Sequence, residues 1–205
     1  MRTRIRIVLA VGLVAAAVFM NGCLFNLLQT ATTLGEGNAA LMIGSGLLHF
    51  QAEGNHNWSL TPQARIGFGI SDTVDFGLQT GAFIPLSTGD PGWLGAKGDL
   101  KFLLTGRDSD IAMALGFGGG YGAEFFGWGL FLEVFLDSKL ENFPIFFAYQ
   151  PTFPLGGQAF AVWHHLAGGL RLALSPTARI LIVFDARLPG DPFLSSFGFG
   201  FEIDL

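Results

Sequence analysis

Residues from Asn38 to the end of the chain alternate between apolar side chains and polar or small ones, and this alternation limits the possible folds more than any other feature. Side chains of a β-strand point alternately to its two faces, so a period of two places the apolar ones on one face. In residues 96–104, for example, Lys97, Asp99 and Lys101 share one face and most of the apolar side chains share the other. The pattern predicts a series of amphipathic β-strands.

We count ten such segments, and eight or twelve strands also fit the pattern. Seven segments alternate regularly, at 63–70, 74–79, 96–104, 111–118, 128–137, 179–187 and 197–205, and three only in part, at 38–50, 143–153 and 158–174. Short polar connections alternate with longer joints, which include 51–61 and 85–95. This asymmetry between the two ends is typical of an up-and-down β-barrel in an outer membrane, with short turns on the periplasmic side.

The composition favours lipid around this barrel. Hydrophobic residues make up 50% of the chain and charged residues only 13%, whereas about 25% is usual for a soluble domain. Beyond the N-terminus, no segment has the roughly 18 uninterrupted apolar residues that a spanning helix needs. We therefore expect an all-β fold, a transmembrane antiparallel barrel over residues 38–205 with its apolar face toward lipid. The alternative, a lipid-tethered periplasmic β-domain, would have to bury the apolar rows between two sheets.

The N-terminus predicts secretion. Arg2, Arg4 and Arg6 precede an apolar run at 7–20, which gives residues 1–22 the form of a signal peptide. The part that follows has eight basic and sixteen acidic residues, a side-chain charge of −8. Phosphate binding needs a basic face, so nucleic acid is not expected as a partner.

Cys23 follows the apolar run directly, in Met20-Asn21-Gly22-Cys23. This sequence resembles a bacterial lipobox, which implies that Cys23 is lipidated and becomes the mature N-terminus at the outer membrane. An ordinary signal peptide with an incidental cysteine is the alternative. For residues 23–37 we expect a tether or short helix at the periplasmic surface, and a small plug inside the barrel is the less favoured possibility.

Charged side chains on the polar face predict an ion-pair network in the lumen, because buried charges must be paired. The expected members are Arg65, Asp75, Lys97, Asp99, Lys101, Glu133, Asp137, Arg171, Arg179, Asp185, Arg187, Glu202 and Asp204. The sequence has no cysteine and histidine spacing typical of zinc, so no metal or other cofactor is expected.

The last residues resemble the C-terminal signal of outer-membrane barrels. Gly200 is followed by apolar residues spaced by one, Ile203 and Leu205, at the end of the chain. The resemblance covers the small outer-membrane barrel class over about residues 38–205, without pointing to one family. It implies outer-membrane lipids and the barrel assembly machinery as partners.

Two classes of function fit this sequence. A structural or surface-interaction barrel without catalytic activity is the first, and a narrow channel for small solutes is the second, because inward glycines such as Gly67, Gly77 and Gly116 would leave space. A hydrolase is a distant third. In barrel lipid A deacylases a serine stands two residues after the histidine, but Leu166 holds that place after His164. Omptin proteases have acidic and histidine residues at their outer rim. In this chain the residues of these types expected near that rim are His49, Glu53, His56, Asp90 and Asp191.

Overall fold

The computed structural model describes residues 29–52, 55–86, 92–106, 109, 111–122, 127–138, 144–155, 162–188 and 193–205. The expected signal peptide and Cys23 lie outside these residues. Within them, no helix is long and apolar enough to cross a membrane.

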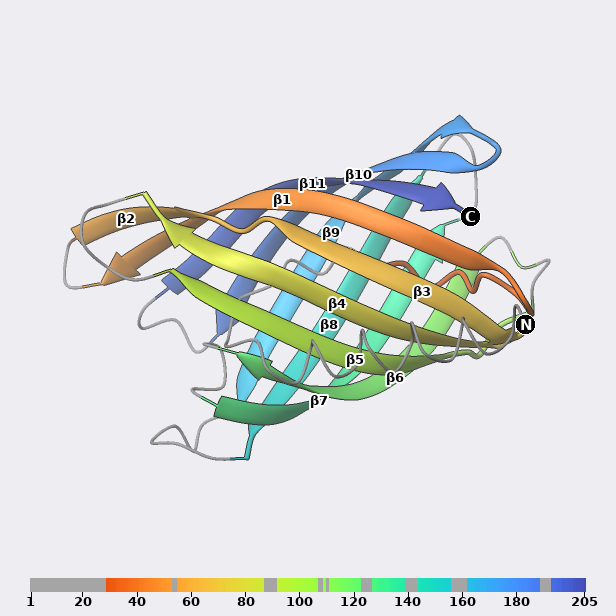
Figure 1. Ribbon diagram of the computed structural model, residues 1–205, viewed down its shortest axis with the longest axis horizontal. Helices are drawn as coiled ribbons and strands as arrows, with labels where there is room; N and C mark the ends of the chain where they lie inside the picture. Colours follow the sequence, from red (N-terminus) through yellow and green to blue (C-terminus); the bar gives the residue numbers. More distant parts are fainter. Residues whose placement is uncertain are drawn as a thin grey trace, which may run out of the picture.

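The described residues form a closed antiparallel β-barrel, as the alternation predicted (Figure 1). Apart from β2 and β3, strands that follow one another in the sequence pair in the sheet, and the first strand, β1 (Ala39–Ala52), pairs with the last, β11 (Phe193–Asp204), to close it. The strands are β1 (Ala39–Ala52), β2 (Asn55–Leu60), β3 (Gln63–Ser71), β4 (Val74–Pro85), β5 (Trp93–Leu103), β6 (Ile111–Gly122), β7 (Gly127–Ser138), β8 (Ile145–Pro154), β9 (Trp163–Ser175), β10 (Ala178–Leu188) and β11 (Phe193–Asp204).

The β2 and β3 strands occupy one position in the barrel, which makes ten positions for eleven strands. Both pair with β1 on one side and with β4 on the other. Thr61 and Pro62 interrupt them, because proline has no N–H to donate to a ladder. The joint expected at 51–61 is therefore wrong, since most of it is strand.

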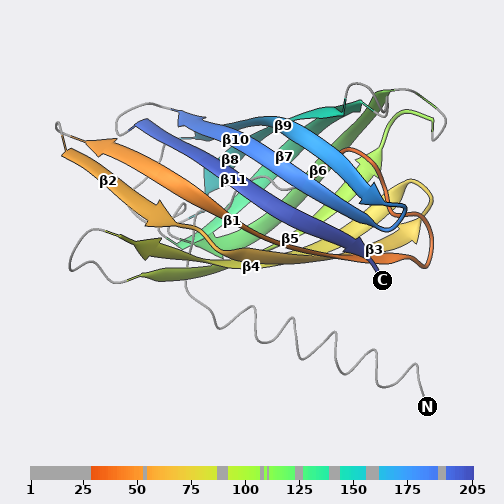
Figure 2. The same ribbon diagram turned by 90° about the horizontal axis from the view of Figure 1, so that it is seen from above.

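The two ends of the barrel differ, as expected. The end that we call the short-turn end carries the β3–β4 and β9–β10 turns, the start of β1 and the C-terminus (Figure 2). The opposite end, which we call the long-loop end, carries the β4–β5 and β10–β11 connections, and most of the residues in these lie outside the described ranges.

Large apolar side chains cover the outer wall on every strand. Those at least about one third exposed include Ile43, Trp58, Phe68, Ile84, Leu94, Phe117, Leu132, Phe147, Leu172, Phe184 and Phe199. Most inward side chains are charged, polar, small or aromatic, and a few, such as Leu48 and Leu181, are aliphatic. The period of two thus sorts the wall as the sequence predicted.

The lumen also has an apolar region, which the sequence pattern did not predict. Phe135, Phe146, Leu181 and Val183 are buried together on the inner side of β7, β8 and β10, with inward alanines around them. Charged side chains gather mainly on the other strands, so one part of the lumen is packed like a soluble core and the other is held by polar contacts.

Candidate functional site

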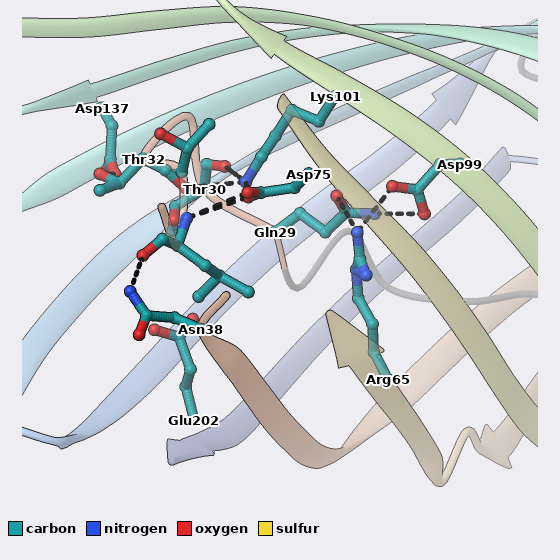
Figure 3. A network of polar contacts seen from close by, with 12 residues as sticks. Gln29, Thr30, Thr32, Asn38, Arg65, Asp75, Asp99, Lys101, Asp137 and Glu202 are labelled. Carbon is teal, nitrogen blue, oxygen red and sulfur yellow. Dashed lines mark hydrogen bonds and ion pairs between the residues drawn. The ribbon is translucent and has the colours of Figure 1, made fainter. Parts of the chain in front are cut away.

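A short N-terminal segment lies in the lumen near the short-turn end and contacts the charged part of the inner wall. We call residues 29–36 the N-terminal strap. Gln29 lies between Arg65 and Asp99, with 3.0 Å from Arg65 Nη2 to its Oε1 and 3.3 Å from its Nε2 to Asp99 Oδ2 (Figure 3). Ala31 is completely buried. The strap is therefore bound inside the barrel, with Gln29 deeper than the residues that follow.

Lys101 holds the strap by its main chain. The Lys101 Nζ donates to the carbonyl oxygens of Thr30 at 3.0 Å and Thr32 at 2.8 Å, and it forms an ion pair with Asp75 Oδ2 at 3.2 Å. Asp75 in turn accepts from the N–H of Leu34, at 3.1 and 3.2 Å from its two oxygens. One ion pair of the wall thus satisfies two carbonyls and one amide of an otherwise irregular segment.

Thr32 links the strap to the opposite part of the wall. Its hydroxyl donates to Asp137 Oδ2 at 3.0 Å and accepts from Arg171 Nη1 at 3.3 Å. Asp137 and Arg171 also form a looser ion pair at 3.6 Å. Strands β3, β4, β5, β7 and β9 therefore all contact the strap.

This placement corrects the expected surface tether for the described part of residues 23–37. Residues 29–36 form no helix and lie in the lumen. This placement agrees with the less favoured expectation, a small plug inside the barrel. The physical reason is that the Gln and Thr residues of this segment form hydrogen bonds with the charged side chains of the inner wall. The position of residues 23–28 lies outside the described residues.

Two further ion pairs lie deeper in the lumen. Arg65 Nη2 is 2.6 Å from Asp99 Oδ1, and Lys97 Nζ is 3.3 Å from Glu133 Oε1; all four side chains are less than one tenth exposed. Lys97 also donates to Gln150 Oε1 at 3.2 Å and lies 5.0 Å from the centre of the Phe131 ring. These contacts across the lumen draw β3, β5, β7 and β8 together.

A third group of charges lies toward the short-turn rim. Arg171 and Arg179 share Glu202, at 3.0 and 2.8 Å from its Oε1. Arg179 also makes two parallel bonds to Asp204, of 2.8 and 3.0 Å. A cavity of about 270 Å³ lies between this group and the strap.

The structure brings together twelve of the thirteen charged residues expected in the lumen, all but Arg187, whose side chain lies outside the described residues. Asp185 has a partner that the sequence did not indicate, since His165 Nε2 lies 3.3 Å from its Oδ1. His164 and His165 are adjacent in the sequence but do not lie together. Adjacent residues of a strand face opposite ways, so His165 is buried inside and His164 bonds to the Tyr149 hydroxyl at 2.7 Å on the outer wall.

The inward glycines do not leave an open lumen. A Cβ on Gly77 would overlap the Arg65 guanidinium, and one on Gly69 would overlap the main chain of Gly35 in the strap. At Gly116 a Cβ would lie 2.8 Å from the Glu133 carboxylate. These glycines accommodate neighbouring groups against the wall, and the space expected from them is occupied.

Other candidate residues do not assemble into a catalytic group. Among the described side chains, no cluster of three or more His, Cys, Asp or Glu could hold a metal ion. Of the rim residues considered for a hydrolase, only the His49 side chain is described, and its ring lies 4.6 Å from that of Trp58. The Gly200, Ile203 and Leu205 of the expected assembly signal lie on β11 and at the chain end, with Ile203 and Leu205 exposed on the outside.

Comparison with known proteins found no matching family model and no matching curated protein. Solved barrels are similar in form. The outer-membrane protease OmpT of Escherichia coli shares 8% identity over 86% of this chain and 100% of its own, with a TM-score of 0.46. The translocator domain of autotransporter NalP from Neisseria meningitidis shares 11% over 84% and 90%, with a TM-score of 0.45. Neisserial surface protein A shares 8% over 82% and 99%, with a TM-score of 0.42.

Proposed function

We propose that this chain is an integral outer-membrane β-barrel with a filled lumen, which serves as a structural or surface-interaction barrel rather than as an enzyme. The continuous apolar outer wall is the observation that carries this proposal. Exposed apolar side chains occur on all eleven strands, whereas soluble monomers rarely expose apolar patches beyond a few hundred Å².

The dimensions support a membrane location. Strands of 12 residues, such as β4, β6 and β7, rise about 40 Å along their length. At a tilt of about 45° this height becomes about 28 Å, close to the apolar band of about 25 Å on outer-membrane barrels. Trp58 and Trp128 are exposed toward the long-loop end, where aromatic side chains favour the interface between lipid and water.

The filled lumen supports a structural role over a permanently open channel. The strap, three groups of ion pairs and the apolar cluster occupy the inner wall from the short-turn rim to the level of Lys97. A pore for solutes would need a continuous aqueous path at rest, which these contacts oppose.

Heat-modifiability tests the barrel proposal. Cells that express the full chain are fractionated, and the outer-membrane fraction is run on a denaturing gel with and without boiling. We expect the protein in that fraction and a mobility shift on boiling, because a closed barrel resists detergent until it is heated. A protein that is soluble after Cys23→Ser and shows no shift would refute the membrane barrel and favour a tethered periplasmic domain.

We also propose that Cys23 carries a lipid, on the basis of the lipobox resemblance. Metabolic labelling with a fatty acid should label the wild-type protein but not Cys23→Ser. Equal labelling of both, or of neither, would refute the assignment and leave the barrel proposal untouched.

A further inference from the structure

We infer that the outer wall of β8 and β9 binds a lipid of the outer leaflet through a polar site within the apolar band, and that this lipid is one with amide-linked and hydroxylated acyl chains. The site consists of Tyr149, His164 and the main chain at Pro151 and Leu132, and we call it the wall site. The inference rests on the proposed membrane barrel and goes beyond it, because it gives one patch of the wall a specific lipid partner.

Two polar side chains meet on the outer face of these strands. The Tyr149 hydroxyl lies 2.7 Å from His164 Nδ1, and the two rings are stacked, with 6.0 Å between their centres and 5° between their planes. Both side chains are half-buried, whereas Phe147 and Phe153, on the same face of β8, are exposed. An ionisable side chain within a membrane is costly, so a histidine in this position indicates a functional site.

The histidine ring can offer a donor to a lipid. In the wall site the Tyr149 hydroxyl donates to Nδ1 of His164, which places the ring hydrogen of the neutral imidazole on Nε2. Among the described residues, Nε2 has no hydrogen-bond partner. An oxygen atom of a neighbouring lipid would supply one.

Pro151 removes a hydrogen bond from the sheet beside this pair. The main-chain groups of a strand point alternately to its two neighbours, and Leu155 N donates to Trp128 O of β7, so position 151 also faces β7. The register places Leu132 opposite Pro151, and the ladder is interrupted there, between the pairs Phe131↔Thr152 and Val134↔Tyr149. Because proline has no N–H, the Leu132 carbonyl lacks its donor from the ladder.

The donor and the acceptor lie at one level of the wall. Pro151 pairs with His164 of β9 on its other side, so Leu132, Pro151 and His164 form one row across three strands. A main-chain carbonyl in the hydrocarbon region needs a hydrogen-bond donor, because no water is present to supply it. A lipid that accepts from His164 and donates to Leu132 would satisfy both groups.

The row lies within the apolar band, on the side of the long-loop end. Leu132 is four residues along β7 from the exposed Trp128, which is about 13 Å of strand and about 9 Å of depth at a tilt of about 45°. Tryptophan favours the interface between lipid and water, and the long-loop end of such barrels faces outward. The wall site is therefore at the level of the acyl chains in the outer leaflet.

The chemistry of the site selects among lipids at that level. Glycerophospholipids have ester carbonyls next to their acyl chains, which accept hydrogen bonds but do not donate them. Lipopolysaccharide has amide-linked and hydroxylated acyl chains, whose N–H and O–H groups donate and whose oxygens accept. We therefore assign a lipopolysaccharide acyl chain as the occupant of the wall site.

Lipid binding by the full-length protein tests this assignment. The protein is purified in detergent, freed of lipid and titrated with lipid A, and the lipid bound per barrel is counted by native mass spectrometry. We expect Tyr149→Phe and His164→Phe each to weaken binding about threefold to tenfold, because each disrupts one hydrogen-bonding group of the site. The matched control is Thr80→Val, which should bind as the wild type does. Thr80 is exposed on the outer face of β4, and its hydroxyl donates within the wall, to Gly95 O at 2.9 Å.

Pro151→Ala provides a second and independent test. The alanine N–H can complete the ladder to Leu132, which removes the acceptor that the lipid would use. We expect weaker binding of lipid A together with a higher temperature for the mobility shift on boiling. A proline with a structural role alone would not couple a more stable barrel to weaker lipid binding. This variant also decides the matter if Tyr149→Phe and His164→Phe do not fold.

The other outcomes separate the wall site from the barrel. Equal binding of lipid A by the wild type, Tyr149→Phe and Pro151→Ala would overturn the site and leave the barrel proposal standing. Equal binding of phosphatidylglycerol and lipid A by the wild type would overturn the assigned lipid. A wild type that is dimeric without lipid, beside a monomeric Tyr149→Phe, would show that a second copy occupies the site and would overturn the proposal. Failure of the wild type to shift on boiling would overturn the barrel proposal itself.

Discussion

The Gly77→Ala substitution should destabilise the barrel through a side chain on the neighbouring strand. A Cβ at position 77 would occupy the place of the Arg65 guanidinium, which is buried over β4. The guanidinium would have to leave that place. Its 2.6 Å contact with Asp99 and its 3.0 Å bond to Gln29 would then be lost or stretched.

The expected loss of stability follows from these contacts. Breaking a buried ion pair costs about 3–5 kcal/mol, and overpacking that the surroundings absorb costs about 1–3 kcal/mol. Because the arginine is long and flexible, part of the bond to Asp99 can re-form after a shift. We therefore expect the free energy of unfolding to fall by about 2–4 kcal/mol.

Gly98→Ala provides the matched control. Gly98 lies on the adjacent strand β5, and a Cβ there would meet Leu78 Cδ2 at 3.4 Å and the Gly77 carbonyl oxygen at 3.7 Å, which are ordinary contacts. We expect a change within about 0.5 kcal/mol, as for most surface substitutions. Both variants and the wild type are refolded into lipid vesicles, and their unfolding is followed in a urea titration.

Equal stability of Gly77→Ala and Gly98→Ala would refute the reasoning. It would mean that the Arg65 guanidinium is free to move at no cost, and that its pair with Asp99 does not hold β3 against β5. A loss in Gly77→Ala that persists when Arg65 is replaced by Met would likewise show that the clash is not with the arginine.

Three further variants test other parts of the structure. Phe117→Arg, near the middle of the outer wall, should lower the free energy of unfolding in vesicles by about 2–4 kcal/mol, and Ile111→Arg, at the short-turn end of the same strand, by about 0–1 kcal/mol; equal losses would refute a lipid band centred on Phe117. Lys97→Met should cost about 3–5 kcal/mol because it leaves Glu133 buried and unpaired, and adding Glu133→Leu should restore most of this; a double variant as unstable as the single one would contradict the pairing. Leu205→Asp should reduce the amount of heat-modifiable protein in the outer membrane several-fold with little change in refolding in vitro, which separates recognition by the assembly machinery from barrel stability.

The alternation of residues predicted the wall because it is a local property. Whether Lys97 or Asp99 faces inward depends only on the period of two along one strand, and the structure places both inside. The exceptions have a local cause as well. Pro62 divides one barrel position into β2 and β3, and Pro151 lies within β8, in a region that the sequence pattern left irregular.

The ion-pair partners could not be predicted from the same pattern. Arg65 and Asp99 are 34 residues apart, and Lys97 and Glu133 are 36 apart, on strands that are not neighbours in the sheet. Which side chains meet across the lumen depends on strand tilt and register, which the sequence does not give. The pair of His165 with Asp185 was missed because nothing marked the first of the two histidines as the outward one.

The strap was assigned to the surface for a related reason. Leu24, Leu27, Leu28 and Ala31 are spaced as one face of a short helix, and a single short apolar face is too weak a signal to favour a plug over a surface tether. The position of the strap is set by partners from five different strands, among them Lys101 and Asp137, which come together only when the barrel has closed. The information that places the strap is therefore distributed over the whole barrel.

The inward glycines show why a small residue in a barrel wall is ambiguous in a sequence. A glycine opposite another small residue leaves space, whereas a glycine opposite a long side chain accommodates it. The register pairs Gly118 with Phe131, Gly116 with Glu133 and Gly169 with Phe146, so each of these glycines faces a long inward side chain on the next strand. A Cβ on any of the three would lie within 3.0 Å of its partner side chain or closer to main chain. Glycine in this barrel thus keeps long side chains against the wall, and this leaves the axis near the short-turn end for the strap.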